Sequence, residues 1–361
     1  MLRGLAVGLV MLCHAWTITF GGAGIVGVTT FFALSGYLIT GLLIRDVDRH
    51  GGLRPRRFYT HRVFRLYPAL IALLAGYCVV SLAMGTVSVV RLAESVVIGL
   101  LYLADLPSHF FAPATGLAHL WTLAVEEQFY LVWPWVLLLG LRRQRVGLAL
   151  SVSFAAVIAA SIAVPLLLPI GTHPIYQSPT SWAVTLLMGA AARIYRQRIA
   201  ERLRRRWLCW GSLVLLLVLC FVPSADKHVW LFLVLGPVVA AAAIVMIFTL
   251  EQMPTVCGGL RPLLGLGTIS YAAYLWNYPI TVWLPPENNT DMPLGWGLIS
   301  IMLTVLAAVI SWYTVEAAGR ALRARYQATE RDRPSGGQPH RPRLRWRGSG
   351  SDGPRPPRFA R

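Results

Sequence analysis

The chain has 361 residues, of which 56% are hydrophobic and 13% are charged. This composition lies far outside the range of soluble globular domains and excludes that class. A formal net charge of +18 would suggest nucleic-acid binding in a soluble protein, but in so apolar a chain it indicates membrane topology, so we expect no nucleic-acid partner. The five cysteines show no CxxC spacing, and we expect neither a disulfide framework nor a bound metal.

Apolar runs of membrane-spanning length occur ten times and predict an all-α polytopic membrane helix bundle with about ten transmembrane helices. They lie at residues 3–20, 26–44, 66–84, 119–141, 146–168, 180–194, 207–223, 229–250, 264–284 and 294–315. The first run lacks the small-residue cleavage site of a signal peptide, so we expect it to be retained. Residues 88–106 form an additional stretch with three charged side chains, and we predict a re-entrant or interfacial segment there.

Basic side chains predict how the chain is oriented. With ten crossings and both termini cytosolic, every basic cluster falls inside, and only Arg91 and Lys227 of the 33 Lys and Arg residues lie outside. We therefore expect a multi-pass protein of the cell inner (plasma) membrane. From about residue 320 the chain is rich in Arg, Pro and Gly, which predicts a transmembrane domain at 1–319 and a disordered cytosolic tail at 320–361.

His14 is the most informative polar residue, because it lies inside the first apolar run, eleven residues after Arg3. This separation is close to three helical turns, or ~16 Å, so both side chains share one helix face and His14 lies at mid-membrane depth. An imidazole at that depth is costly and indicates function, although a hydrogen bond to a neighbouring helix would also explain it.

A second polar face occurs in the fourth run. It consists of His119, Thr122, Glu126 and Tyr130, which follow i, i+3, i+7, i+11 spacing. Glu126 lies ~10 Å below the outer surface, within one helical turn of the level of the histidine in the first run. Glu127 points ~100° away from this face, and we interpret it as a structural acid that is paired with Arg or capped by backbone.

Two further polar residues reach the same layer. Ser35 descends to ~14 Å and Asn277 rises to ~10 Å below the outer face. Four polar side chains from four spans are thus expected to share one cavity in the outer half of the membrane. The alternatives are that Ser35-Gly36 is a small-residue helix contact and that Asn277 joins helices by hydrogen bonding.

A basic pair, Arg62 and Arg65, lies at the cytosolic mouth of the third run, one helical turn apart. The planar guanidinium fork suits phosphate oxygens, so this pair could hold a polyphosphate such as that of coenzyme A. A basic loop that sets topology explains the same spacing, and both interpretations stay open.

Together these segments resemble the acyltransferase-3 family of integral membrane acyltransferases. The resemblance rests on Leu2-Arg-Gly-Leu-Ala followed by His14, on Phe31 to Leu38, on Arg-Arg-Phe-Tyr with Arg62-Val-Phe-Arg65-Leu-Tyr-Pro, on His119 to Tyr130, on Ser270-Tyr with Tyr-Leu-Trp, and on Ser311-Trp-Tyr with Val-Glu316. These motifs are weak singly but stand in the same order over residues 2–316.

The resemblance implies transfer of an acyl group, often acetyl, from cytosolic acyl-coenzyme A to a hydroxyl group of a carbohydrate or a glycosylated small molecule. The acyl-coenzyme A is a co-substrate, and no permanently bound cofactor is implied. At matching positions, Arg3 and His14 correspond to the family's catalytic first-helix pair, Arg62 and Arg65 to its acyl-coenzyme A contact, and Glu126 to its acid. We assign substrate binding to Ser35, His119, Tyr130, Trp276 and Asn277.

One mechanism fits these assignments and predicts a membrane O-acyltransferase with an intramembrane His/Glu site. His14, kept neutral by burial, acts as general base on the acceptor hydroxyl or as a transient acyl carrier, and Glu126 orients it. The alternative is a proton-coupled secondary transporter or exporter, in which His and Glu at mid-depth would move protons. Against transport, no pair of Gly/Pro-interrupted spans recurs in the two halves of the chain. A non-catalytic scaffold would leave the polar layer unexplained.

Overall fold

The computed structural model of the chain describes residues 1–106, 113–167, 171–203, 205–223, 227–252, 258–285 and 291–331. These residues form helices joined by short connections, and no strand occurs among them. The helices that matter for the site are α1 (Leu2–Ala15), α2 (Gly21–His50), α3 (Pro55–Met84), α5 (Trp121–Arg142), α13 (Ser270–Trp283), α14 (Leu294–Tyr313) and α15 (Val315–Arg331). The others are α4 (Val89–Leu100), α6 (Val146–Leu167), α7 (Thr172–Gln177), α8 (Pro179–Ile194), α9 (Arg196–Leu203), α10 (Arg206–Leu219), α11 (Val229–Leu250) and α12 (Arg261–Thr268).

The protein is an all-α membrane helix bundle, as the sequence predicts. Helices α2, α3, α6, α11 and the stretch Leu294–Ala328 are long and apolar enough to cross a membrane, and α1 and α10 are shorter apolar helices. Each of the ten apolar runs overlaps with at least one helix, while the number of complete crossings stays a prediction. The segment 88–106 contains only the 12-residue helix α4, which at ~18 Å is too short to cross the ~30 Å hydrocarbon core.

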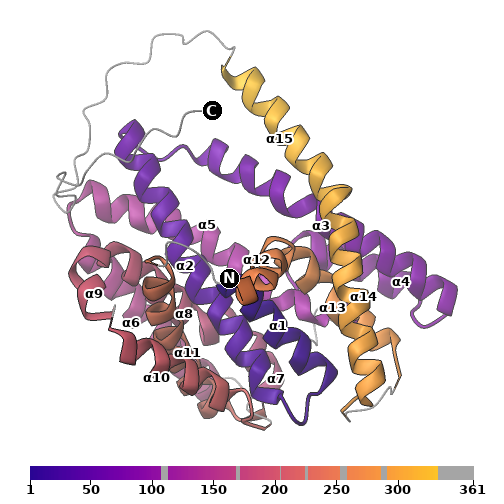
Figure 1. Cartoon of the computed structure of the whole chain (residues 1–361). Helices are drawn as coiled ribbons and strands as arrows, with labels where there is room; N and C mark the ends of the chain where they lie inside the picture. The colour runs from indigo at the N-terminus through magenta and orange to yellow at the C-terminus, as the bar shows by residue number, and fades with distance from the viewer. Residues whose placement is uncertain are drawn as a thin grey trace.

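The first two helices lie at the centre of the bundle. Figure 1 shows α1 and α2 with α12 and α13 on one side and with α8, α10 and α11 on the other. A buried apolar cluster joins α1, α2, α3, α5 and α13, with Val7, Phe32, Leu73, Val125 and Leu275 among its members. The polar face of α1 is therefore enclosed by protein rather than by lipid, which is the condition for keeping charged and imidazole groups there.

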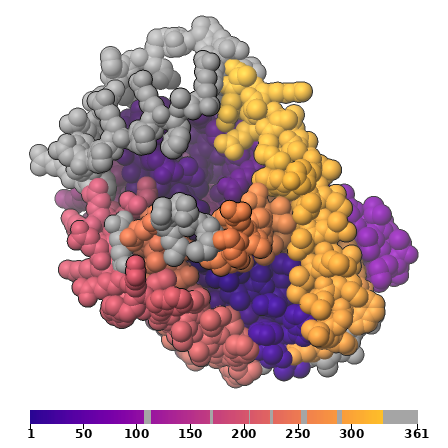
Figure 2. Space-filling view, in the orientation of Figure 1, coloured from indigo at the N-terminus to yellow at the C-terminus, as the bar shows by residue number. Residues whose placement is uncertain are grey.

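The predicted tail boundary at residue 320 needs correction. Helix α15 continues to Arg331, and residues 332–361 lie outside the described part of the chain. The helix persists because one of its faces packs on α3: the rings of Tyr326 and Phe64 have centroids 5.9 Å apart, and Gln327 contacts His61 at 2.9 Å. In Figure 2, α3 and α4 project beyond α14 and α15 at the edge of the molecule.

Helices α2 and α8 cross in close contact through glycines. A Cβ atom on Gly36 would overlap the carbonyl oxygen of Leu186, and one on Gly189 would overlap the carbonyl oxygen of Ala33. Small residues let helix backbones approach in this way inside membranes. Within the Ser35-Gly36 pair, Gly36 makes the contact between the helices, whereas Ser35 lines a cavity.

Gly36→Ala is expected to destabilise the protein by about 1–3 kcal/mol, because the added methyl group must push the α8 backbone away. Thermal unfolding in detergent measures the effect. Gly211→Ala is the matched control, since a Cβ atom there meets no heavy atom within 4 Å, and alanine has the better helix propensity. Equal melting temperatures for the two variants would contradict the close α2–α8 contact.

Candidate active site

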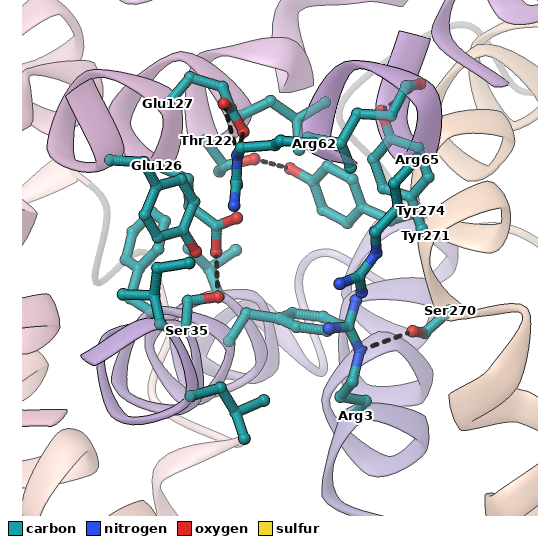
Figure 3. A pocket seen from close by; sticks show the side chains of 18 of the residues that line it. Arg3, Ser35, Arg62, Arg65, Thr122, Glu126, Glu127, Ser270, Tyr271 and Tyr274 are labelled. Carbon is teal, nitrogen blue, oxygen red and sulfur yellow. Dashed lines mark hydrogen bonds and ion pairs between the residues drawn. The ribbon is translucent and has the colours of Figure 1, made fainter. Parts of the chain in front are cut away.

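Two neighbouring cavities share lining residues from α2, α5 and α13, and the first cavity is lined by charged groups. This cavity, which we call the arginine chamber, has a volume of about 110 Å³ and lies between α1, α2, α3, α5 and α13 (Figure 3). Its polar lining consists of Arg3, Ser35, Arg62, Arg65, Thr122, Glu126, Glu127, Tyr130, Ser270, Tyr271 and Tyr274.

Arg62 is bound to a carboxylate inside the arginine chamber. Its Nε donates to Glu127 Oε2 at 2.7 Å and its Nη2 donates to Oε1 at 2.6 Å, while the guanidinium carbon lies 3.5 Å from the ring centroid of Tyr130. Both charged side chains are only 18% exposed. Glu127 is therefore the structural acid that the sequence analysis described, paired with arginine, and a planar guanidinium stacked on a ring is held firmly in place.

Arg3 and Arg65 form a different arrangement. Figure 3 shows their guanidinium groups pointing toward one another at one side of the chamber, Arg3 from α1 and Arg65 from α3. Arg3 Nε donates to Ser270 Oγ at 3.1 Å, and neither arginine has an ion pair within the described residues. Two facing guanidinium groups without a carboxylate between them can together bind an anionic or strongly polarised oxygen.

Glu126 contacts Ser35. The Ser35 hydroxyl donates to Glu126 Oε1 at 2.8 Å, and both residues line the arginine chamber. The expectation that Glu126 orients His14 is wrong, because the histidine lines another cavity and has another partner. The four polar residues expected in one cavity come together as two pairs, Ser35 with Glu126 and His14 with Asn277.

The second cavity, which we call the histidine chamber, has a volume of about 520 Å³. Its lining includes His14, His119, His173, Trp121, Thr122, Tyr176, Gln177, Lys227, Tyr274 and Tyr278. Three imidazoles, several aromatic rings and an amide give this chamber the mixture of apolar faces and hydrogen-bonding groups that is typical of sites for polar organic ligands.

Asn277 fixes the tautomer of His14. His14 Nδ1 lies 2.6 Å from Asn277 Oδ1, and Asn277 Nδ2 donates to Thr304 Oγ1 at 3.3 Å. An amide oxygen only accepts hydrogen bonds, so Nδ1 carries the proton and Nε2 keeps a lone pair. This is the histidine half of the arrangement found in nucleophilic and base catalysis, with an amide as the orienting group.

The remaining predicted substrate-binding residues occupy different positions. His119 lines the histidine chamber, and its Nε2 donates to the carbonyl of Leu275 at 3.1 Å. Tyr130 lines the arginine chamber beneath Arg62. Trp276 lines neither chamber and faces α3, where a Cβ atom on Gly76 would come within 2.6 Å of its ring. The chamber residues Tyr274, Tyr278 and His173 were not among the predicted site residues, although Tyr274 belongs to the Tyr-Leu-Trp segment on which the family resemblance rests.

A third cavity, the basic pocket, adjoins the arginine chamber and has a volume of about 480 Å³. Its polar lining consists of Arg45, Asp46, Arg49, His50, Arg54, Arg57, His61, Arg62, Arg65, Arg323 and Gln327. Its carboxylate, Asp46, is bound by Arg54 at 2.8 Å. Arg62 and Arg65 line both cavities, so they connect the basic pocket with the arginine chamber.

Asn277→Ala is expected to lower kcat about tenfold or more, because a hydrogen bond that selects the tautomer of His14 is lost. The rate of acyl transfer is measured at saturating concentrations of acyl donor and acceptor, and KM for the acyl donor should change little. Thr304→Val is the matched control: it removes the next hydrogen bond in the series but leaves the His14–Asn277 contact, so its loss should be smaller. An Asn277→Ala protein with unchanged kcat would show that Asn277 does not position His14.

Comparison with known proteins identifies the family. The family model described as an acyltransferase domain, of the acyltransferase-3 type, matches residues 1–314. The chain is 28% identical to "Putative peptidoglycan O-acetyltransferase YrhL" of Bacillus subtilis over 87% of the chain and 53% of that protein, and 28% identical to "Peptidoglycan O-acetyltransferase OatA" of Listeria monocytogenes over 87% and 54%. It is also 27% identical to "O-acetyltransferase OatA" of Staphylococcus aureus over 87% of the chain and 55% of that protein.

These curated relatives are longer, and the chain spans about half of their length. No solved structure matches the chain. The family model nevertheless covers the residues that form both chambers, from Arg3 on α1 to Tyr278 on α13. The chain belongs to the acyltransferase-3 family.

Proposed function

We propose that this protein is a membrane O-acyltransferase that moves an acyl group, acetyl in the first instance, from cytosolic acyl-coenzyme A to a hydroxyl group of a carbohydrate. The observation that carries the proposal is the His14–Asn277 pair, which leaves an imidazole lone pair in a cavity large enough for a sugar. The relatives whose names specify peptidoglycan favour a cell-wall carbohydrate as the acceptor.

The donor is assigned to the basic pocket and the arginine chamber. Coenzyme A carries a diphosphate and a 3′-phosphate, which suit the guanidinium groups of the basic pocket. Arg65 lies where the basic pocket meets the chamber, so a donor anchored in the pocket would direct its thioester into the arginine chamber. There the facing Arg3 and Arg65 can bind the thioester carbonyl oxygen and hold the donor until its acyl group moves to the acceptor.

The acceptor is assigned to the histidine chamber. His14 Nε2 accepts the proton of the acceptor hydroxyl while that oxygen attacks the acyl carbon, and the C–S bond breaks to release coenzyme A as its thiolate, which takes up a proton. A transient acyl group on Nε2 is the two-step form of the same reaction. Glu126, bound to Ser35, balances the charge of the arginine cluster in this proposal.

The proposed orientation places the basic pocket in the cytosol and the histidine chamber toward the outer face of the plasma membrane, with both termini cytosolic. It follows from the positive-inside rule, because the basic pocket contains the clustered arginines of α2 and α3.

Release of coenzyme A tests the proposal. The purified protein in lipid nanodiscs is mixed with acetyl-coenzyme A and with cell-envelope extract as a pool of acceptors. We expect release that depends on the extract and on His14. If the wild type releases coenzyme A no faster than His14→Ala, with acetyl-coenzyme A and with longer acyl donors, the proposal is overturned. Proton-driven uptake of a solute without thioester cleavage would then establish the proton-coupled transporter instead.

A further inference from the structure

The arginine chamber and the histidine chamber share a wall. Val28, Thr122 and Tyr274 line both cavities, and they come from α2, α5 and α13. In the proposed reaction the thioester lies on one side of this wall and His14 on the other. The acyl group therefore has to pass the wall to reach the histidine.

Tyr274 has the largest side chain of the wall. Its ring contacts Phe31, which lines the arginine chamber, and His119, which lines the histidine chamber, with centroid distances of 6.3 and 5.5 Å. A large aromatic side chain thus fills the space where the two cavities approach each other.

Hydrogen bonds hold this ring in place. The Tyr274 hydroxyl lies 2.6 Å from Thr122 Oγ1 and donates to the carbonyl oxygen of His119 at 2.9 Å. Because each hydroxyl has one proton, the Thr122 hydroxyl donates either to Tyr274 Oη or to the same carbonyl, which lies 3.2 Å away. Figure 3 shows the Thr122–Tyr274 bond at the edge of the arginine chamber. The ring can move out of the wall only when these bonds break.

We propose that Tyr274, held by Thr122, is the residue that selects the acyl group by size, and that it restricts the donor to short acyl groups such as acetyl. This inference rests on the proposed function and extends it to donor specificity. A two-carbon acyl group needs a small displacement of the ring, whereas a longer chain needs the hydrogen-bonded ring to leave its place. The chamber on the donor side, about 110 Å³, also has little room for a long chain.

Donor preference is the first test. The kcat/KM values of acetyl-, butyryl- and hexanoyl-coenzyme A are compared for the wild type, Tyr274→Phe and Thr122→Val. Both variants remove hydrogen bonds that hold the Tyr274 ring but nearly keep the shape of the wall. The kcat/KM for hexanoyl-coenzyme A divided by that for acetyl-coenzyme A, the hexanoyl-to-acetyl ratio, should therefore rise about tenfold. Tyr271→Phe is the matched control, because Tyr271 lines the arginine chamber but not the wall and its hydroxyl donates to Leu66. Its hexanoyl-to-acetyl ratio should equal that of the wild type.

The second test does not depend on acyl transfer. Cys13 lines the histidine chamber and Ser35 the arginine chamber. In cells or sealed vesicles, a membrane-impermeant thiol reagent is applied to the face from which Cys13 reacts. In a Cys13→Ser background, Ser35→Cys should be protected from that face, and adding Tyr274→Ala should speed its labelling about tenfold or more, since the side chain that fills the wall is gone.

The two tests separate this inference from the proposed function. Rapid labelling of Ser35→Cys with Tyr274 intact, or a hexanoyl-to-acetyl ratio unchanged in both wall variants while acetyl transfer persists, would overturn the role of Tyr274. If no donor releases coenzyme A with any variant, the proposed function fails, and the labelling result alone then decides whether Tyr274 separates the chambers.

Discussion

Replacing His14 by alanine is expected to lower acyl transfer by about 100-fold or more, because the reaction loses its base. The structure strengthens this expectation, since Asn277 holds the imidazole in a single tautomer with a lone pair on Nε2. The assay is coenzyme A release in nanodiscs with envelope extract, and the melting temperature of each variant verifies that it is folded.

The matched control for this prediction is His228→Ala, which removes an exposed imidazole that lines neither chamber. Its turnover should equal that of the wild type. A folded His14→Ala protein with wild-type turnover would exclude His14 as base and as acyl carrier. Incubation with acetyl-coenzyme A alone, followed by rapid quenching and mass spectrometry, separates these two roles, because only an acyl carrier gains an acetyl group on the peptide that contains His14.

The helix face that a side chain occupies could be predicted from the sequence, but the partners of that side chain could not. Counting residues predicted that Arg3 and His14 share one face of α1. In the structure that face meets α13, where the two side chains contact Ser270 and Asn277. The same arithmetic placed Glu126 at the level of His14 and suggested a shared site. Height within a membrane leaves the rotation of each helix open, and the wall residues from α2, α5 and α13 separate the two groups.

The partners of charged side chains also could not be predicted from the sequence. The sequence left open whether Arg62 binds phosphate or serves topology, and whether Glu127 is paired with Arg or capped by backbone. The structure answers the second question, because Glu127 accepts hydrogen bonds from Arg62, while the role of Arg62 toward phosphate stays a prediction. Their separation of 65 residues gives no local signal for this contact. The end of α15 was missed for a related reason: the composition of residues 320–331 suggests disorder, whereas contacts with α3 stabilise the helix.

Arg62 and Arg65, one turn apart on α3, are expected to differ in what their loss does. Arg62→Ala leaves the Glu127 carboxylate buried without its partner, which should destabilise the protein by about 3–5 kcal/mol. Arg65→Ala removes a guanidinium that has no ion pair within the described residues, so folding should be nearly unchanged while KM for acyl-coenzyme A rises. Thermal unfolding and donor titration of both variants measure the difference.

A double variant decides whether the Arg62 effect comes from the ion pair. The double variant Arg62→Ala/Glu127→Ala removes both charges, so no carboxylate is left buried and unpaired. Its loss in the free energy of unfolding should therefore be smaller than the sum of the losses of the two single variants. If Arg62→Ala instead melts like the wild type and raises the donor KM as much as Arg65→Ala does, then Arg62 contacts the donor directly. In that case the Glu127 pair must open when acyl-coenzyme A binds, and the two arginines would act together on the phosphates.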